Sequence, residues 1–300
     1  MSMNQSVLIC DQVNPVLNEI LEKNGLQITY EPEITPEQIL EKIENFEVII
    51  VRSRTKITKD MIEKANKCQI IARVGVGLDN IDQAAAKEKN IRVINAVEGA
   101  MNAVAELVIG LMLSLAREIP RADREVRNGN WIKKELMGTE LRGKYLGIVG
   151  LGNIGKRLGR LARALNMNII GYDVVPIDEE FSSEVGLMKA DLGTLLASSD
   201  YVSLHVPLLD STKHLINAEK MSTMKNTSRI INTSRGGVID EDALYEFLKD
   251  GKLGGAALDV FEVEPATSNK LASLPNFIST PHMGAQTKEA QSLAANVIAE

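Results

Sequence analysis

Short apolar runs alternate with amphipathic segments along most of this chain of 300 residues. From residue 6 the first series reads SVLIC, NPVLNEILEKNG, QITY, TPEQILEKIENF, EVIIVRS, TKDMIEKANK, CQIIARV, NIDQAAAKEKN and IRVINA. A second series of the same character runs from YLGIVG at residue 145 to NFISTP at residue 276. Strands that alternate with helices form parallel sheets, because each helix returns the chain to the same end of the sheet. The alternation therefore predicts an α/β fold with two doubly wound parallel sheets.

A long apolar segment separates the two series. AVAELVIGLMLSLA covers residues 103–116, and a helical pattern extends from Asn102 to about Ile119, where Pro120 ends or kinks it. The apolar stretch is too short to span a bilayer, and it contains Glu106. It holds more apolar residues than one core-facing stripe requires. Either the helix is buried on all sides or it also packs against a second subunit, and the residues alone leave both open.

Composition excludes several classes of protein. The 34 basic and 40 acidic residues are well mixed along the chain and give a net charge of -6, which disfavours binding to nucleic acid or to an anionic membrane. The two cysteines, Cys10 and Cys68, begin apolar runs and lack metal-ligand spacing, so we expect reduced, buried thiols and no metal site. Nothing near Met1 resembles a targeting leader, and we expect a cytoplasmic protein.

The second series opens with a glycine pattern between a strand and a helix. GIVGLGNIG follows the apolar strand directly and precedes a helix with apolar residues at intervals of three and four. In this context G-x-G-x-x-G permits a tight turn, close approach of a pyrophosphate and close packing of helix on strand. An acid 18 residues after the last glycine suits the adenosine ribose and repels a 2′-phosphate, which favours NAD over NADP. The expected cofactor residues here are Gly150, Gly152, Asn153, Ile154, Gly155 and Asp173.

Polar residues that end the later strands are candidates for catalysis, because ligands of doubly wound sheets bind beyond the carboxyl ends of the strands. A histidine such as His282 is by itself more often structural, but an Arg, an acid and a His at three consecutive strand ends fit oxidation of a secondary alcohol beside a carboxylate. In this scheme His282 takes the hydroxyl proton, Glu264 holds the imidazole and Arg235 binds the carboxylate. Asp259 is expected on the nicotinamide side. The further expected cofactor residues are His205, Pro207 and Thr233.

The chain resembles the D-2-hydroxyacid dehydrogenase family in VRSRT, RVGVGLDNID, GIVGLGNIG, NTSRGGVIDEDAL, GAALDVFEVEP and TPHMGAQTKEAQ. The resemblance implies that Arg235, Glu264 and His282 are catalytic, and that Asp173 and Asp259 contact the ribose and the nicotinamide of NAD. It also implies a substrate-side domain of residues 1–97 and 284–300, an NAD-binding domain of residues 98–283, and an active site in the cleft between them. Members of the family are typically dimers, which favours a homodimer through residues 102–135.

Two arginines follow the strand EVIIV and flank Ser53. Because Arg52 and Arg54 lie at the carboxyl edge of the predicted substrate-side sheet, they suit a phosphate better than a plain carboxylate. By resemblance, Lys133 reaches the substrate phosphate of the neighbouring subunit, and the backbone of Gly75, Val76 and Gly77 approaches the substrate carboxylate.

One loop departs from the pattern of those relatives that act on a phosphorylated acid. NAVEGAMNAVAEL has Val97 and Ala100 where many of these relatives have Pro and a substrate-contacting Asn, and Asn102 lies two positions further on. The departure puts one substrate hydrogen bond in doubt and leaves room for a different 2-hydroxy acid.

The expected reaction is oxidation of D-3-phosphoglycerate to 3-phosphohydroxypyruvate with NAD, at the entry to serine biosynthesis. Two alternatives stay open. One is reduction of hydroxypyruvate or glyoxylate, or action on another D-2-hydroxy acid, on the same scaffold. The other is a binding module that senses NADH, because transcriptional corepressors use this fold and retain its catalytic residues.

Overall fold

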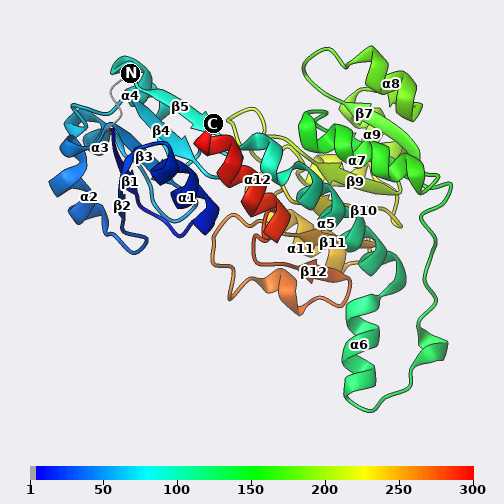
Figure 1. Ribbon diagram of the computed structural model, residues 1–300. Coiled ribbons are helices and arrows are strands. Elements are labelled where there is room, and N and C mark those ends of the chain that lie inside the picture. The colour runs from blue at the N-terminus through cyan, green and yellow to red at the C-terminus, as the bar shows by residue number, and fades with distance from the viewer. Residues whose placement is uncertain (1–4) are drawn as a thin grey trace. The chain divides into compact units, whose positions relative to one another are not determined.

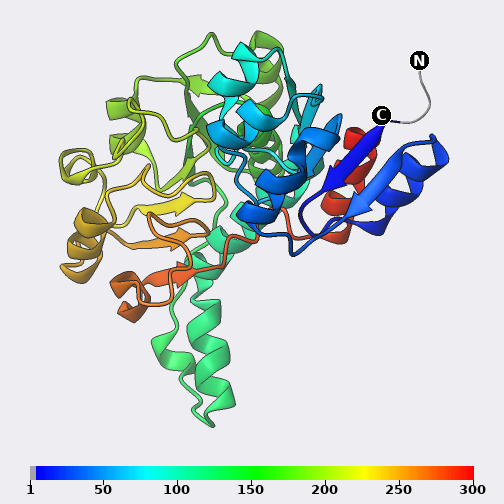
Figure 2. The same ribbon diagram turned by 90° about the vertical axis from the view of Figure 1, so that its left-hand side faces the viewer.

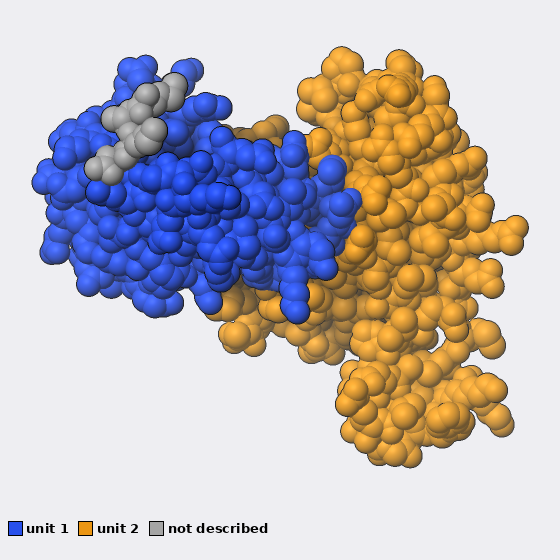
Figure 3. All heavy atoms as spheres, viewed as in Figure 1, with its two compact units in different colours: residues 1–103, 285–300 blue, residues 104–284 orange. Residues whose placement is uncertain are grey.

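The computed structural model describes residues 5–300, which divide into two compact units. Unit 1 comprises the described residues up to 103 together with residues 285–300, and unit 2 comprises residues 104–284 (Figure 3). The C-terminal segment thus returns to the unit that contains the start of the chain.

Unit 1 is built on a five-stranded sheet in the order β2-β1-β3-β4-β5, and every pair of neighbouring strands is parallel (Figure 1). This is the flavodoxin-like order of a doubly wound sheet. The strands are β1 (Ser6–Ile9), β2 (Gln27–Tyr30), β3 (Val48–Val51), β4 (Ile70–Arg73) and β5 (Arg92–Asn95). The helices are α1 (Pro15–Lys23), α2 (Pro36–Lys42), α3 (Lys59–Lys64), α4 (Gln83–Glu88) and α12 (Lys288–Ala299), with a 3-10 helix at Ile43–Asn45.

The two faces of this sheet carry separate apolar clusters. Successive side chains of β1 point to opposite faces, so Val7 packs with α1 and α12 while Leu8 packs with α2, α3 and α4. Leu17 of α1 and Ala295 of α12 are fully buried in the first cluster. Because both faces are covered, the central strand β3 is apolar and buried throughout rather than alternating.

Unit 2 is built on a seven-stranded parallel sheet in the order β12-β11-β10-β9-β6-β7-β8. The strand order reverses between β6 and β9, where doubly wound sheets bind ligands. The strands are β6 (Tyr145–Val149), β7 (Asn168–Tyr172), β8 (Met188–Lys189), β9 (Tyr201–Leu204), β10 (Arg229–Asn232), β11 (Gly255–Leu258) and β12 (Phe277–Ser279). The helices are α6 (Ile119–Arg127), α7 (Asn153–Ala164), α8 (Glu179–Val185), α9 (Leu192–Ser198), α10 (Ala218–Ser222) and α11 (Glu241–Lys249), with 3-10 helices at Lys133–Glu135 and Lys270–Ser273. The predicted α/β class with two doubly wound parallel sheets is confirmed.

Helix α5 (Val97–Arg117) crosses the boundary between the units and is longer than the apolar stretch inside it. The expectation that this segment is too short to span a bilayer is wrong, because the helix has the length and composition to cross one. In the structure 56% of its most apolar window is buried, and Val108 and Met112 lie in the core of unit 2. The helix is not buried on all sides, since Glu106 and Gly110 are exposed and Leu113 is 39% exposed.

The chain turns sharply after α5. Helix α5 ends at Arg117, Glu118 adopts the left-handed conformation with φ 51°, and α6 starts at Ile119. Pro120 lies in the first turn of α6, where its missing N–H is tolerated, so it helps to start a new helix instead of ending the old one. Figure 2 shows α6 and the chain after it standing out from the rest of unit 2.

The two cysteines give a test of the packing in unit 1. Burial raises the pKa of the Cys10 thiol to about 12 and that of the Cys68 thiol to about 11. For Cys10 this lowers the thiolate fraction near neutral pH by roughly a thousandfold, and the thiolate is the reactive form. We expect an aromatic disulfide reagent to modify neither thiol in the native protein and both in denaturant, counted by absorbance. Fast modification of one thiol in the native protein would contradict this packing.

Candidate active site

The glycine turn after β6 is shaped by close backbone contacts. Gly150 has φ 92°, and a Cβ there would lie 2.4 Å from the carbonyl oxygen of His205. A Cβ on Gly155 would lie 2.1 Å from the carbonyl oxygen of Gly150. A Cβ on Gly152 would meet no protein atom within 4 Å. The fold itself therefore requires the first and third glycines, whereas the second leaves the backbone open to a ligand at the start of α7, which Asn153 and Ile154 begin.

Asp173 follows β7 and lies at the same turn. Its Oδ2 accepts a hydrogen bond from the backbone N–H of Leu151 at 2.6 Å, and its Oδ1 accepts one from Val175 at 3.1 Å. The acid predicted from spacing alone is thus hydrogen-bonded to the glycine turn, although Asp173 and Leu151 are 22 positions apart in the sequence.

The residues around the end of β9 and β10 fit a nucleotide cofactor. Burial lowers the pKa of His205 to about 4, so its imidazole is neutral near pH 7, and its Nε2 lies 2.9 Å from the Ser203 hydroxyl. The Thr233 hydroxyl is buried and has no hydrogen-bond partner among the described residues. Buried polar atoms without a partner are rare in proteins, so this hydroxyl suits a contact with bound ligand. Pro207 is exposed after β9, and its carbonyl accepts from Thr212 at 2.6 Å.

His282 and Glu264 form a hydrogen-bonded pair beyond the ends of β12 and β11. The distance from His282 Nδ1 to Glu264 Oε2 is 2.8 Å, and Glu264 Oε1 accepts from the backbone N–H of Phe261 at 3.0 Å. The His282 side chain is 51% exposed and that of Glu264 is 36% exposed. Since the carboxylate occupies Nδ1, Nε2 is the ring nitrogen left to exchange a proton with a substrate.

Asp259 holds the turn that carries His282. Its buried carboxylate accepts from the Met283 N–H at 2.8 Å, the Gly284 N–H at 2.9 Å and the Thr280 hydroxyl at 2.6 Å. The His282 N–H donates to the Asp259 carbonyl at 2.9 Å. These bonds stabilise a left-handed backbone at His282, where φ is 52°, a conformation that costs a non-glycine residue about 1 kcal/mol or more. The predicted contact of Asp259 with nicotinamide stays a prediction.

Arg235 lies on a turn built by Asn232, a residue not expected from the sequence to have a role in the site. Asn232 is buried, donates from Nδ2 to the Arg235 carbonyl at 2.8 Å, and accepts at Oδ1 from the Ser234 N–H and hydroxyl. An Asn that bonds the backbone two residues on is a common turn signal, which could have identified it. A Cβ on Gly236 would lie 1.8 Å from the Phe261 carbonyl oxygen, so the Arg235 turn packs directly on the segment that leads to Glu264.

The two arginines expected to bind substrate have unequal surroundings in unit 1. The Arg54 guanidinium pairs with the Asp11 carboxylate at 3.1 Å and donates to the carbonyls of Cys10 at 2.5 Å, Pro32 at 2.8 Å and Ile34 at 3.1 Å. The Arg52 guanidinium makes longer contacts, at 3.5 Å to the Gln12 carbonyl and 3.4 Å to Gln286 Oε1.

The side chains of Asp11 and Asn80 hold the loop that carries these arginines. The Asp11 carboxylate is buried and accepts from the Arg52 N–H at 2.5 Å and from the Thr55 hydroxyl at 2.7 Å. Asn80 donates to the carbonyls of Arg52 at 2.9 Å and Thr55 at 2.7 Å. Ser53, at the exposed tip of this loop, accepts a bond from Arg73 at 3.4 Å.

The remaining predicted substrate residues fall in two places. Gly75 has φ 157° and follows β4 with Val76 and Gly77; Gly75, Arg52 and Ala100 line one small cavity of unit 1, of about 20 Å³. Ala100 therefore lies near Arg52, one of the predicted substrate residues. Lys133 lies exposed in the 3-10 helix of unit 2.

The strand order, the glycine turn and the His–Glu pair together define a two-domain α/β protein of the dinucleotide-binding kind. Residues 109–284 match the family model for the D-isomer specific 2-hydroxyacid dehydrogenase, NAD binding domain. The chain belongs to the D-isomer specific 2-hydroxyacid dehydrogenase family, and this segment is its NAD-binding domain.

Relatives of known name fall into more than one group. The chain is 47% identical over 295 residues to a D-3-phosphoglycerate dehydrogenase of Methanocaldococcus jannaschii, covering 98% of this chain and 56% of that protein. It is also 47% identical over 275 residues to a hydroxypyruvate reductase of Thermotoga maritima, covering 91% of this chain and 88% of that protein. The chain thus spans about half the length of the phosphoglycerate dehydrogenases it matches.

Solved structures show the same fold. A glyoxylate reductase of Paecilomyes thermophila superposes with a TM-score of 0.91 at 30% identity, covering 99% of this chain and 93% of that one. A D-lactate dehydrogenase of Aquifex aeolicus, solved with NAD and lactic acid, superposes with a TM-score of 0.85 at 31% identity, covering 98% and 93%.

The different roles of the glycines in the turn can be separated by substitution. In Gly152→Ala the new methyl meets no protein atom but occupies the open side of the turn, so we expect NADH affinity to fall at least about tenfold. The free energy of unfolding should fall by less than about 1 kcal/mol. In Gly155→Ala the methyl meets backbone, and the folded state itself should be destabilised. NADH fluorescence titration and thermal unfolding measure the two effects, and an unchanged NADH affinity in Gly152→Ala would refute the assignment.

Proposed function

We propose that this chain oxidises D-3-phosphoglycerate to 3-phosphohydroxypyruvate with NAD, the first step of serine biosynthesis. The observation that carries the proposal is the 2.8 Å hydrogen bond between His282 and Glu264 within an NAD-binding domain. A histidine with one nitrogen on a carboxylate and the other nitrogen free for a substrate is suited to general base catalysis.

The proposed chemistry divides the work among three side chains. His282 accepts the hydroxyl proton of the substrate at Nε2, and Glu264 stabilises the imidazolium that forms. Arg235 binds the substrate carboxylate through its guanidinium fork. Bound NAD supplies the acceptor for the hydride that leaves the carbinol carbon. Gly150, Gly152, Gly155, Asp173, His205 and Thr233 are the residues that would hold the cofactor.

The proposed choice of a phosphorylated substrate rests on Arg52. Among the described residues its guanidinium makes long contacts, to the Gln12 carbonyl at 3.5 Å and to Gln286 Oε1 at 3.4 Å, whereas the Arg54 guanidinium is bound to Asp11 and three carbonyls. We therefore assign the phosphate to Arg52 with Ser53, and to Arg54 the support of their loop. The backbone N–H groups of Gly75, Val76 and Gly77 are proposed to approach the substrate carboxylate.

A homodimer is part of the proposal. Apolar side chains stay exposed on the arm after α5, with Trp131 82% and Met137 87% exposed, and Leu113 adds to the exposed side of α5. Exposed apolar patches of this kind mark protein interfaces. Residues 102–135 would then form the contact, and Lys133 would act at the partner's substrate.

Reduction of hydroxypyruvate or glyoxylate is the second candidate. It is favoured by the identity to a hydroxypyruvate reductase, which equals that to a phosphoglycerate dehydrogenase. The two candidates differ in whether the substrate carries a phosphate, so the charged residues of unit 1 distinguish them.

Substitution of Arg52 tests the substrate. We expect Arg52→Gln to lower kcat/KM for D-3-phosphoglycerate by about 10- to 100-fold and to leave D-glycerate nearly unchanged, because a hydrogen bond to a charged group contributes about 1.5–3 kcal/mol. Initial rates of NADH formation, followed by absorbance, measure kcat/KM for both acids. The neighbouring exposed Lys56→Gln serves as the control. Equal losses on both acids would favour the hydroxypyruvate reductase assignment.

The pH dependence tests the role of His282. Oxidation of the alcohol needs the neutral imidazole as base, and reduction of the ketone needs the protonated imidazole as acid. We expect the optimum for oxidation to lie at higher pH than that for reduction, measured as initial rates in both directions with saturating cofactor. Coincident optima would speak against His282 as the proton carrier.

A further inference from the structure

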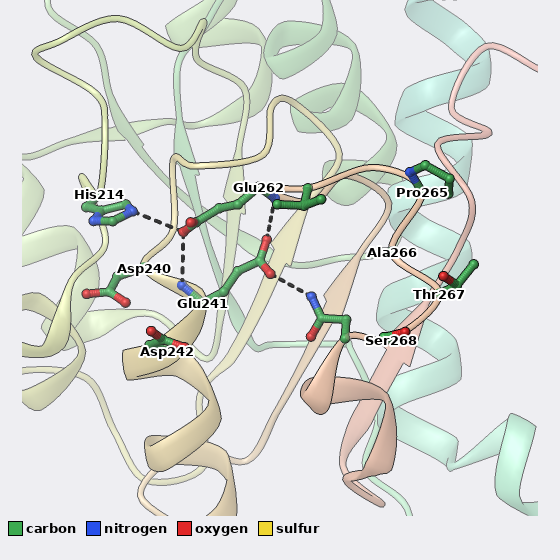
Figure 4. A pocket seen from close by; sticks show the side chains of 11 residues that line it. His214, Asp240, Glu241, Asp242, Glu262, Pro265, Ala266, Thr267 and Ser268 are labelled. Carbon is green, nitrogen blue, oxygen red and sulfur yellow. Dashed lines mark hydrogen bonds and ion pairs between the residues drawn. The ribbon is translucent and has the colours of Figure 1, made fainter.

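The segment Phe261–Asn269 carries Glu264 and borders a cavity of about 470 Å³ in unit 2. Figure 4 shows this cavity, which is lined by acidic side chains from the start of α11 and from the segment itself. Each of these acids already has a protein partner. Glu262 pairs with His214 at 3.0 Å, Asp242 pairs with Lys270 at 2.7 Å, and Asp240 caps α11 by accepting the Ala243 N–H at 3.0 Å. The acidic side chains therefore form a network of hydrogen bonds and ion pairs that joins the start of α11 to the segment Phe261–Asn269 and its neighbours.

Glu241 is the centre of this network. Its Oε1 accepts the backbone N–H of Glu262 at 2.6 Å, and its Oε2 accepts the side-chain Nδ2 of Asn269 at 2.6 Å (Figure 4). The Glu262 carboxylate in turn accepts the backbone N–H of Glu241 at 3.4 Å. One carboxylate at the start of α11 thus ties both sides of the segment to a rigid helix.

The tied positions flank the residue that pairs with His282. Glu264 lies two residues after Glu262, and its own Oε1 accepts the Phe261 N–H at 3.0 Å. Between them Val263 is 76% exposed, so apolar packing does not hold this part of the segment. Phe261 is buried, and its carbonyl fits against Gly236. The position of the Glu264 carboxylate therefore depends on the hydrogen bonds at Glu241 and on the contact at Gly236.

We propose that Glu241 is a positioning residue: it orients Glu264, and through Glu264 the imidazole of His282. The inference rests on the proposed function, in which the His282–Glu264 pair carries the proton transfer. Glu241 itself acts only on the segment Phe261–Asn269. Hydrogen bonds to the segment that carries a catalytic group fix the position of that group. A shift of about 1 Å in a catalytic group costs as much as 100-fold in rate.

The variant Glu241→Gln tests this with little change in shape. Its amide can accept only one of the two donors, and its NH₂ group then faces the other donor. We expect kcat for oxidation to fall about tenfold, with KM for NAD changed less than about twofold, because the cofactor turn lies elsewhere in unit 2. Glu246→Gln, on the same helix with its carboxylate paired to Lys249, is the matched control and should keep the activity of the unsubstituted protein.

A double-mutant cycle shows whether Glu241 acts through Glu264. If it does, Glu241→Gln should lower kcat by less than about twofold in the Glu264→Gln background, because the group it positions is already altered. A loss of about tenfold in both backgrounds would overturn the inference. Thermal unfolding of all four proteins separates this outcome from a general loss of stability.

Acylation of His282 by diethyl pyrocarbonate gives a measure that does not need turnover. The reagent acylates a ring nitrogen that carries no proton, and the hydrogen bond from Nδ1 to Glu264 fixes the orientation of the imidazole, so loss of the pair should free the ring and speed the reaction. At one pH just below neutrality, peptide mass spectrometry should show faster modification in Glu264→Gln and Glu241→Gln and an unchanged rate in Glu246→Gln. Faster modification in Glu264→Gln alone would overturn the inference.

These outcomes separate the inference from the proposed function. Absence of turnover with every 2-hydroxy acid in the unsubstituted protein would refute the function, while the acylation rates would still report on the positioning of His282. If Glu241→Gln does not fold, Asn269→Asp replaces it. That variant keeps the acceptor for the Leu271 N–H, at 3.0 Å, and turns a second carboxylate toward Glu241, so the same changes in kcat and acylation are expected.

Discussion

The hydrogen bond between His282 and Glu264 joins two loops that follow different strands, and its geometry depends on how both loops are held. The parallel sheet brings the ends of β11 and β12 to one edge, but a sheet edge places Cα atoms only to within a few ångströms. Buried polar groups supply the remaining accuracy. Asp259 accepts three bonds from the turn around His282, and Glu241 accepts bonds from both sides of the segment with Glu264.

Close backbone contacts complete the arrangement. The carbonyls of His205, Gly150 and Phe261 lie where a side chain on Gly150, Gly155 or Gly236 would have to be. Any Cβ at these glycines would push a strand end or a functional loop away from its neighbour. The glycines of the cofactor turn and of the NTSRGG motif therefore have one physical role in common, which is to let two backbone segments touch.

Much of the site could be predicted from the sequence because it depends on local rules. Strand-turn-helix patterning placed Gly150 and Asp173 at one turn, and the strand ends placed His282 near Glu264. The network around Glu241 could not be predicted, because its partners are 21 and 28 residues away and an acid at the start of a helix is usually a cap or solvated. The extent of α5 was missed because its first turn, from Val97, lacks the apolar character of the stretch that follows.

Arg52 and Arg54 have different surroundings because of one buried carboxylate, that of Asp11. Asp11 is 2% exposed, and burying a carboxylate is costly unless a cation and hydrogen-bond donors surround it. Arg54 supplies the cation, while the backbone of Arg52 and the hydroxyl of Thr55 supply donors. The same carboxylate that occupies the Arg54 guanidinium therefore fixes the backbone from which the Arg52 side chain extends. A motif with two arginines thus contains one structural cation and one cation suited to a ligand, a distinction that arises only when β1 and β3 lie side by side.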